Sequence, residues 1–136
     1  MEANRLMIGD WVRRCWTCED TGREVVRDFQ ITEIRKNGET LYAWGKSGNM
    51  GRVDELEPIP ITAEILEKNG FVKSGNYEVW RIICNDYEMR VTPWRFAVIF
   101  LENGADKEEY SAPRPSFVHE LQQALRLCGI KKEIEL

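Results

Sequence analysis

The first sixty residues alternate between short apolar runs and turn-forming residues, which is the pattern of short β-strands. The segment "IGDWVR" predicts a strand at residues 8–13. Residues 24–45 predict two further strands joined at Asn37 and Gly38, because Asn-Gly favours the tight turn of a hairpin. The apolar residues of the earlier of these two strands do not alternate perfectly, and a bulge at residues 28–30 would restore the alternation. They are Val25, Phe29, Ile31 and Ile34.

A glycine-rich loop follows this hairpin, and "RVDELEPIP" then offers one more short strand ended by two prolines. Several short strands at close spacing, with little helical periodicity between them, are typical of a small closed barrel. The spacing of the short strands and the "GDWV" tetrapeptide resemble those of SH3-like barrels of the KOW and Tudor kind. We therefore predict an SH3-like small β-barrel over residues 1–60.

The remaining residues, 61–136, predict an α+β unit. Thr62 is placed to cap a short helix that Asn69 and Gly70 end. The connections between the strands that follow, the last of them at Asn103 and Gly104, are too short for a parallel crossover, so an antiparallel meander is expected. Its strands are predicted at residues 71–73, 77–84, 87–91, 95–101 and 108–112.

The C-terminal segment predicts an amphipathic helix that packs on this sheet. At 100° per residue, its apolar residues fall on one face. Gly129 ends the helix, with Ile130 folding back toward Leu125. The residues of the apolar face are Val118, Leu121, Ala124, Leu125 and Cys128. The predicted fold class is therefore α+β, with units at residues 1–60 and 61–136 that are either two domains or one fused unit.

The polar face of this helix contains the single histidine of the chain. His119 and Glu120 begin an HExxH-like pattern, but Gln123 occupies the position of the second histidine, and an amide is a poor zinc ligand. We therefore predict no metal site, no cofactor and no catalytic residue here. The helix geometry directs this face away from the predicted core. A protein-binding face is the functional hypothesis, formed by His119, Glu120, Gln122, Gln123 and Arg126.

Four cysteines offer a second candidate site. Cys15 and Cys18 form a CxxC pair, and Cys84 and Cys128 would complete four thiolate ligands for zinc. Structural zinc sites usually take their ligands from local pairs, and no second pair occurs in the sequence. Cys84 and Cys128 fall in apolar patterns that are typical of small core residues. Reduced thiols are the expectation, with zinc binding and redox chemistry left as alternatives.

The charge of the chain bears on its partners and compartment. The formal net charge is -4, with nine basic and eleven acidic residues up to Pro60 and ten and twelve after it. Neither half is therefore a basic domain of the kind that binds the phosphate groups of nucleic acids. No run of 18 apolar residues and no signal-like N-terminus is found, so membrane insertion and export are not expected and the predicted location is cytoplasmic.

Nucleic-acid binding remains an alternative for residues 1–60. Trp11, Trp16 and Trp44 would stack on bases if they shared an open face with the arginines, although tryptophans in so small a barrel are expected to lie mostly in its core. Acidic residues are interleaved with the basic residues along almost the whole segment, which argues against nucleic-acid binding. The basic residues are Arg13, Arg14, Arg23, Arg27, Arg35, Lys46 and Arg52.

Three motifs resemble a known group of sequences. "IGDWV" at residues 8–12, "EPIPITAEILEKNGF" at residues 57–71 and "VHELQ" at residues 118–122 are similar to motifs of small uncharacterised proteins from gut anaerobes, their phages and their mobile elements. The resemblance implies no biochemical activity, and it implies that the HExxH-like spacing is accidental. The loop "RRCWTCEDTG" departs from the shorter openings of that group.

The sequence therefore predicts a non-enzymatic interaction protein, an accessory factor of a phage or mobile element that binds a protein through the barrel rim or the His119 face. A nucleic-acid-associated barrel and a metal-dependent enzyme are the alternatives.

Overall fold

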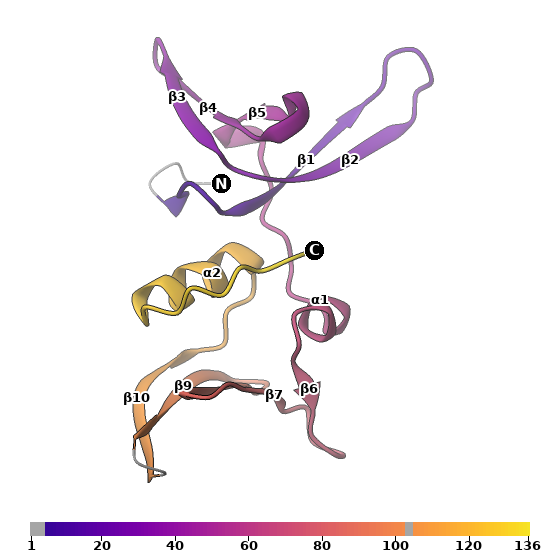
Figure 1. Cartoon of the computed structure of the whole chain (residues 1–136). Coiled ribbons are helices and arrows are strands. Elements are labelled where there is room, and N and C mark those ends of the chain that lie inside the picture. The colour runs from indigo at the N-terminus through magenta and orange to yellow at the C-terminus, as the bar shows by residue number, and fades with distance from the viewer. Residues whose placement is uncertain (1–4, 103–104) are drawn as a thin grey trace. The chain divides into compact units, whose positions relative to one another are not determined.

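The computed structural model describes residues 5–102 and 105–136 (Figure 1). Two compact units divide the chain. The first comprises Met1–Pro60 with Phe117–His119, and the second comprises Ile61–Ser116 with Glu120–Leu136. Helices and antiparallel sheets together make this an α+β protein, as predicted. The division into domains at residues 1–60 and 61–136 stays a prediction.

The strands of the first unit form two antiparallel sheets. The first strand pairs with the second over seven residue pairs, and the third, fourth and fifth form a separate sheet. Among the described residues, these two ladders do not join into one closed barrel. The strands are β1 (Trp11–Thr17), β2 (Glu24–Gln30), β3 (Glu33–Asn37), β4 (Thr40–Trp44) and β5 (Met50–Arg52).

The predicted hairpin at Asn37 and Gly38 is confirmed, and Gly38 adopts the positive φ of 64° that such a turn requires. The predicted bulge at residues 28–30 is wrong, because β2 pairs with β1 in unbroken register through Gln30. The alternation fails instead at Ile31 and Thr32, which lie between β2 and β3. There the chain leaves its pairing with β1 and begins its pairing with β4.

The core of the first unit is mainly aliphatic. Trp11 and Trp44 are half-buried and Trp16 is 37% exposed, so the expectation that the tryptophans lie mostly in the core is wrong. The core is instead formed by Leu6, Val12, Phe29, Ile31, Ala43, Val53 and Leu56.

The "GDW" turn before β1 is fixed by hydrogen bonds. Gly9 adopts a φ of 94°, and its amide donates to the carbonyl of Ile31 at 2.7 Å. Asp10 is fully buried, and its carboxylate accepts a hydrogen bond from the amide of Met7 at 2.9 Å. This motif therefore has a structural explanation.

The second unit begins with a capped helix and continues as a five-stranded antiparallel meander. Thr62 accepts a hydrogen bond from the amide of Ile65 at 3.3 Å, which confirms the predicted cap. The strand order is β10-β9-β8-β7-β6, so the predicted meander is confirmed; its predicted turn at residues 103–104 lies outside the described residues. The elements are α1 (Ala63–Lys68), β6 (Val72–Lys73), β7 (Trp80–Ile83), β8 (Tyr87–Val91), β9 (Arg95–Glu102) and β10 (Ala105–Pro113).

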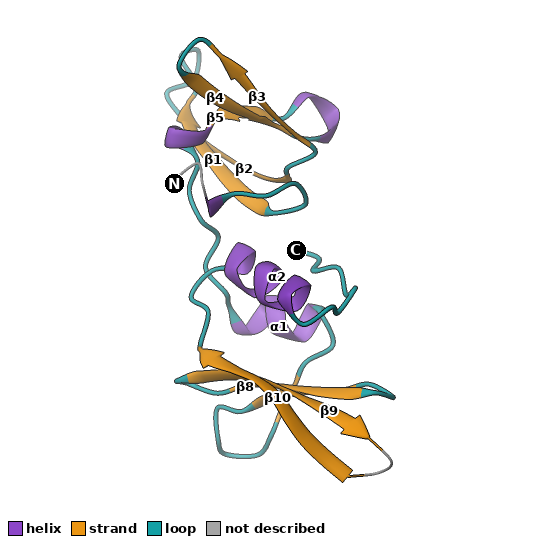
Figure 2. Ribbon diagram, turned by 90° about the vertical axis from the view of Figure 1, so that its left-hand side faces the viewer, coloured by secondary structure: helices purple, strands orange, loops and turns teal. Residues whose placement is uncertain are grey.

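The last helix, α2 (Val118–Leu127), lies with α1 on the same side of the five-stranded sheet (Figure 2). Its predicted end is confirmed, since Gly129 has a φ of 71° and the amide of Ile130 donates to the carbonyl of Leu125 at 2.9 Å. Neither helix in the described ranges combines the length and the apolar composition needed to cross a bilayer.

Asn69 ties the C-terminal segment to α1. Its Nδ2 donates to the carbonyl of Ile65 at 2.8 Å and to the carbonyl of Glu135 at 2.7 Å, while its Oδ1 accepts from the amide of Glu135 at 2.8 Å. The adjacent Ile134 is buried, and Lys68 Nζ donates to the carbonyl of Leu136. One buried amide side chain therefore ends a helix and holds a segment 66 residues away in sequence.

Glu88 in β8 lies between two arginines on the sheet face opposite Met89. Its Oε1 accepts from Arg81 Nε at 2.5 Å and from Arg90 Nε at 3.0 Å, and its Oε2 accepts from Arg90 Nη2 at 3.1 Å. These hydrogen bonds lower the pKa of Glu88, and the hydrogen bond from Arg90 has the largest effect. Burial of the carboxylate opposes this shift.

Replacing Asn69 tests the hold on the C-terminal segment. We expect Asn69→Ala to lower the free energy of unfolding by about 2–3 kcal/mol, because a buried cap bond and both bonds to Glu135 are lost. Urea denaturation followed by circular dichroism measures this, with Asn76→Ala in an exposed turn as the control. Equal losses in the two variants would contradict the assigned role.

Replacing Glu88 tests the arginine cluster through its pH dependence. A carboxylate whose folded-state pKa is depressed stabilises the fold above its unfolded pKa, and this contribution is lost as pH falls through the folded pKa. We expect Glu88→Gln to destabilise the protein by about 1 kcal/mol at neutral pH, a modest value because both arginines are partly exposed.

Thermal unfolding between neutral pH and pH values well below about 4.3, the ordinary glutamate pKa, measures this change. The difference from the wild type should shrink toward the acid end, whereas Glu78→Gln in an exposed loop should unfold like the wild type throughout. A difference that does not depend on pH would rule out the ion pairs as its source.

Candidate functional site

One face of the β1–β2 hairpin presents arginine and tryptophan side chains outside the core. The register places Val12 opposite Phe29, which are both buried, and then Arg14 opposite Arg27 and Trp16 opposite Val25. Side chains two residues apart share a face, so this face leaves the core and continues along the hairpin toward its turn. Figure 1 shows the turn end of the hairpin projecting past the other strands of the first unit.

Arg14 is held in place on this face by two contacts. Its guanidinium carbon lies 4.8 Å from the centroid of the Trp16 ring, and its Nη1 donates to the carbonyl of Met50 at 2.8 Å. The cation–π contact contributes on the order of 0.5–1 kcal/mol at such an exposed position. Arg14, Trp16 and Arg27, together with Asn49 and Met50, are called the arginine–tryptophan surface below. They line a cavity of about 180 Å³ with Phe29 and Gly48.

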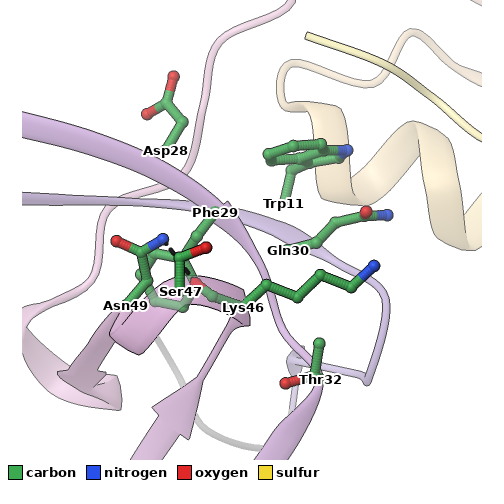
Figure 3. Close-up of a pocket in the computed structure, with 8 residues that line it drawn as sticks. All are labelled: Trp11, Asp28, Phe29, Gln30, Thr32, Lys46, Ser47 and Asn49. Carbon is green, nitrogen blue, oxygen red and sulfur yellow. Dashed lines mark hydrogen bonds between the residues drawn. The ribbon is translucent and has the colours of Figure 1, made fainter.

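A second cavity of about 210 Å³ has Phe29 and Asn49 in common with the first (Figure 3). Figure 3 shows Trp11 on one side and the loop residues Lys46, Ser47 and Asn49 on the other. Asn49 Nδ2 donates to the carbonyl of Lys46 at 2.9 Å, which stabilises this loop. The remaining residues that line the cavity are Asp28, Gln30 and Thr32.

Gly45 lets the loop that contains Lys46 approach β2. A Cβ atom at this position would lie 2.6 Å from Cδ2 of Phe29 and 2.9 Å from the carbonyl oxygen of Gln30. Such distances exclude any side chain without movement of the backbone. The absence of a Cβ at Gly45 therefore helps to place the loop residues of both cavities.

The charges on the two faces of the hairpin differ. On the opposite face Arg13 forms an ion pair with Asp28, with distances of 2.8 and 3.1 Å, and Glu24 lies opposite Thr17. On the arginine–tryptophan surface, the β1 and β2 strands contribute two arginines directly opposite each other and no carboxylate. Like charges opposite each other lower the stability of a sheet, so packing alone does not explain this pair.

A second arginine–tryptophan contact lies on the β3–β4 hairpin. The guanidinium carbon of Arg35 lies 5.8 Å from the ring centroid of Trp44. Arg35 also donates to Glu33 at 2.5 Å, so its charge is balanced by a neighbouring carboxylate. This contact is therefore less suited to bind an anionic group than the arginine–tryptophan surface.

The predicted polar face of α2 is only partly exposed. His119 and Gln122 are buried, Gln123 is half-buried, and Glu120 and Arg126 are exposed. The imidazole of His119 stacks on Phe117 with ring centroids 6.0 Å apart and an angle of 13° between the ring planes. The expectation that this whole face points to solvent is thus wrong, while its partner-binding role stays a prediction.

The cysteines are all free thiols and half-buried. Hydrogen bonding from Thr21 lowers the pKa of Cys18, whereas partial burial raises the pKa of Cys15 and of Cys128. Among the side chains of residues 5–101 and 110–136, His, Cys, Asp and Glu form no group of three or more that would hold a metal ion.

Sequence reasoning named Arg14, Arg27 and Trp16 only within a longer set of basic and aromatic residues. It missed Asn49 and Met50, which meet them through the fold. The register of the β1–β2 hairpin was the missing information, because it decides which of these side chains share a face. Comparisons with family models, with curated proteins and with solved structures gave no match.

Alkylation tests the environment of the thiols. We expect Cys18 to react with iodoacetamide faster than Cys15 or Cys128 at about pH 7, because its thiolate is the most populated of the three. Thr21→Val should slow Cys18 several-fold, whereas Thr17→Val in β1 should not. Peptide mass spectrometry over time measures each rate, and a Cys18 rate that Thr21→Val leaves unchanged would contradict the hydrogen bond.

Proposed function

We propose that the chain is a non-enzymatic binding protein that engages a protein partner through the arginine–tryptophan surface. The observation that carries this proposal is the placement of Arg14 and Arg27 opposite each other beside Trp16, outside the core of the first unit. Trp and Arg are enriched at protein interfaces and among the residues that dominate binding energy. Arg14 is already held by Trp16 and Met50, so binding would order fewer side chains.

An SH3-like barrel is the fold that we propose for the first unit. Several features support this fold. β1 pairs with β2, the chain then bends into β3, the antiparallel strands β4 and β5 follow, and a 3₁₀ turn lies at Val53–Glu55. So does the antiparallel bridge between Arg13 and Glu57, whose two backbone hydrogen bonds of 2.9 and 2.8 Å bring the chain back to β1. In such a barrel the arginine–tryptophan surface would lie at the rim.

Other parts of the proposal extend the sequence predictions. Of the predicted α2 residues, Glu120, Gln123 and Arg126 are proposed as an additional contact, because His119 and Gln122 are buried. The resemblance of "IGDWV" and the other two motifs supports an accessory role in a phage or mobile element, acting in the cytoplasm.

A nucleic-acid partner is the second candidate, favoured by one observation. The β1 and β2 residues of the arginine–tryptophan surface include two arginines and a tryptophan but no carboxylate, a combination that suits phosphates and stacked bases. The acidic excess of residues 1–60 opposes this candidate.

Pull-down with Trp16→Ala combined with Arg27→Glu tests the protein partner. Both residues are exposed, so this double variant should fold as the wild type does. We expect recovery of a wild-type partner from lysates of cells that carry the gene to fall about 30-fold, the loss expected from truncating a dominant contact of about 2 kcal/mol.

Trp94→Ala combined with Lys36→Glu is the matched control, since it removes one exposed tryptophan and reverses one exposed charge elsewhere. Equal recovery of the partner by the wild type, the double variant and the control would reject the arginine–tryptophan surface as the binding site. Quantitative mass spectrometry after nuclease treatment reads out the partner. A steep loss of binding to single-stranded DNA or RNA with rising salt, together with no protein partner, would favour the nucleic-acid candidate instead.

A further inference from the structure

The cavity between Trp11 and the loop of Lys46 takes no part in the binding proposed above, and it is called the Trp11 cavity below (Figure 3). Trp11 lies directly opposite Gln30 in the register, and both side chains belong to the hairpin face of Arg13, not to the arginine–tryptophan surface. The volume of the cavity is about 210 Å³. Sites for drug-sized ligands measure about 300–1,000 Å³, so the Trp11 cavity has room for one ring system with a small substituent.

The strand side of the cavity is held in place by the fold itself. The chain just before Trp11 is fixed, because the carbonyl of Asp10 accepts a hydrogen bond from the amide of Ile31 at 2.9 Å. The side chain of Gln30 is fixed as well, since its Nε2 donates to the carbonyl of Gly9 at 3.0 Å. Aromatic rings stack on the flat face of an indole. A ring that enters the cavity therefore meets a wall that needs little ordering, which lowers the entropic cost of binding.

The charge of the Trp11 cavity is positive on the loop side. Asp28 is the one carboxylate among the described residues that line it, and Arg13 neutralises this group through hydrogen bonds of 2.8 and 3.1 Å. Among the described side chains, no carboxylate forms an ion pair with the exposed Lys46. The ammonium group of Lys46 therefore attracts an anionic group of a ligand.

Ser47, which also lines the cavity, has a backbone conformation that favours glycine. Its φ of 62° and ψ of 30° are left-handed, and among residues 5–102 and 105–136 no other non-glycine residue has a positive φ. A glycine would adopt this conformation without the steric cost of a Cβ atom, so the backbone does not explain a serine here. Strained residues cluster at binding sites, and the hydroxyl group of Ser47 supplies a hydrogen-bond donor at the cavity.

We propose that the Trp11 cavity binds a small ligand that combines one flat ring system with a carboxylate or a phosphate. The ring stacks on Trp11, and the anionic group faces Lys46 and accepts a hydrogen bond from the hydroxyl of Ser47. Aromatic acids and nucleotides share this chemistry and are the two sources of such a ligand. This site goes beyond the protein partner proposed for the arginine–tryptophan surface and does not rest on it.

Titration of the full chain with indole-3-acetate, followed by the indole N–H signals in ¹H–¹⁵N NMR spectra, tests the site. We expect saturable shifts at Trp11 with a Kd on the order of 1 mM, the affinity of a ligand of this size. Indole-3-acetamide lacks the charge and cyclohexylacetate lacks the flat ring, so each should bind about fivefold more weakly. Uridine monophosphate tests the second source: tighter binding than indole-3-acetate identifies a nucleotide, and weaker binding identifies an aromatic acid.

Variants separate the charge from the ring. Lys46→Gln should weaken indole-3-acetate about fivefold and leave indole-3-acetamide unchanged, whereas Trp11→Leu should weaken both. Ser47→Gly should weaken indole-3-acetate without lowering the Tm, because glycine suits this backbone. Lys36→Gln removes another exposed lysine of the first unit and is the control, which should bind as the wild type does.

Other outcomes overturn the proposal. No saturation, shifts confined to tryptophans other than Trp11, or equal affinity for indole-3-acetate and indole-3-acetamide would reject it. So would a Lys46→Gln variant that binds as the wild type does, and this result stands even where circular dichroism shows that Trp11→Leu does not fold. Trp16→Ala combined with Arg27→Glu should leave the titration unchanged, so this test and the pull-down can fail independently.

Discussion

The second unit depends on one side-chain amide. Asn69 ends α1 through the carbonyl of Ile65 and holds the backbone of Glu135 in both directions. The side-chain amide of Asn69 has a fixed number of donors and acceptors. Because it bonds both the amide and the carbonyl of Glu135, it fixes which C-terminal residue lies beside the end of α1. Ile134 is buried beside it, and the C-terminal residues complete the core that the short helix α1 needs, since two turns of helix are not stable alone.

The motifs "IGDWV", "EPIPITAEILEKNGF" and "VHELQ" contain residues whose role in folding the structure explains. In "IGDWV", Gly9 and buried Asp10 fix the turn before β1. In "EKNGF", Asn69 holds the C-terminal segment, and in "VHELQ" Val118 and Leu121 are buried. These motif residues therefore help to determine the fold. The arginine–tryptophan surface uses residues outside these motifs, which is the usual distribution of binding residues over a stable scaffold.

Elements governed by local chemistry could be predicted from the sequence: the hairpin at Asn37 and Gly38, the Thr62 cap, the end of α2 and the meander. Features set by tertiary packing could not. The failed alternation near Ile31 was interpreted as a bulge, although two strands with different partners produce the same pattern. Helical periodicity likewise indicated the apolar face of α2 but not that His119 and Gln122 would be covered. The arginine–tryptophan surface required the register of β1 and β2, which periodicity does not supply.

The facing arginines have a thermodynamic consequence. Arg14 and Arg27 repel each other across the hairpin in the free protein, which makes the folded first unit less stable than it would be with a neutral pair. An anionic group bound between them removes this repulsion and adds attraction, so it binds the folded chain and not the unfolded one. If the proposed partner binds this surface, folding and binding are linked there, and the partner also acts as a stabilising counterion for the strand pair beneath it.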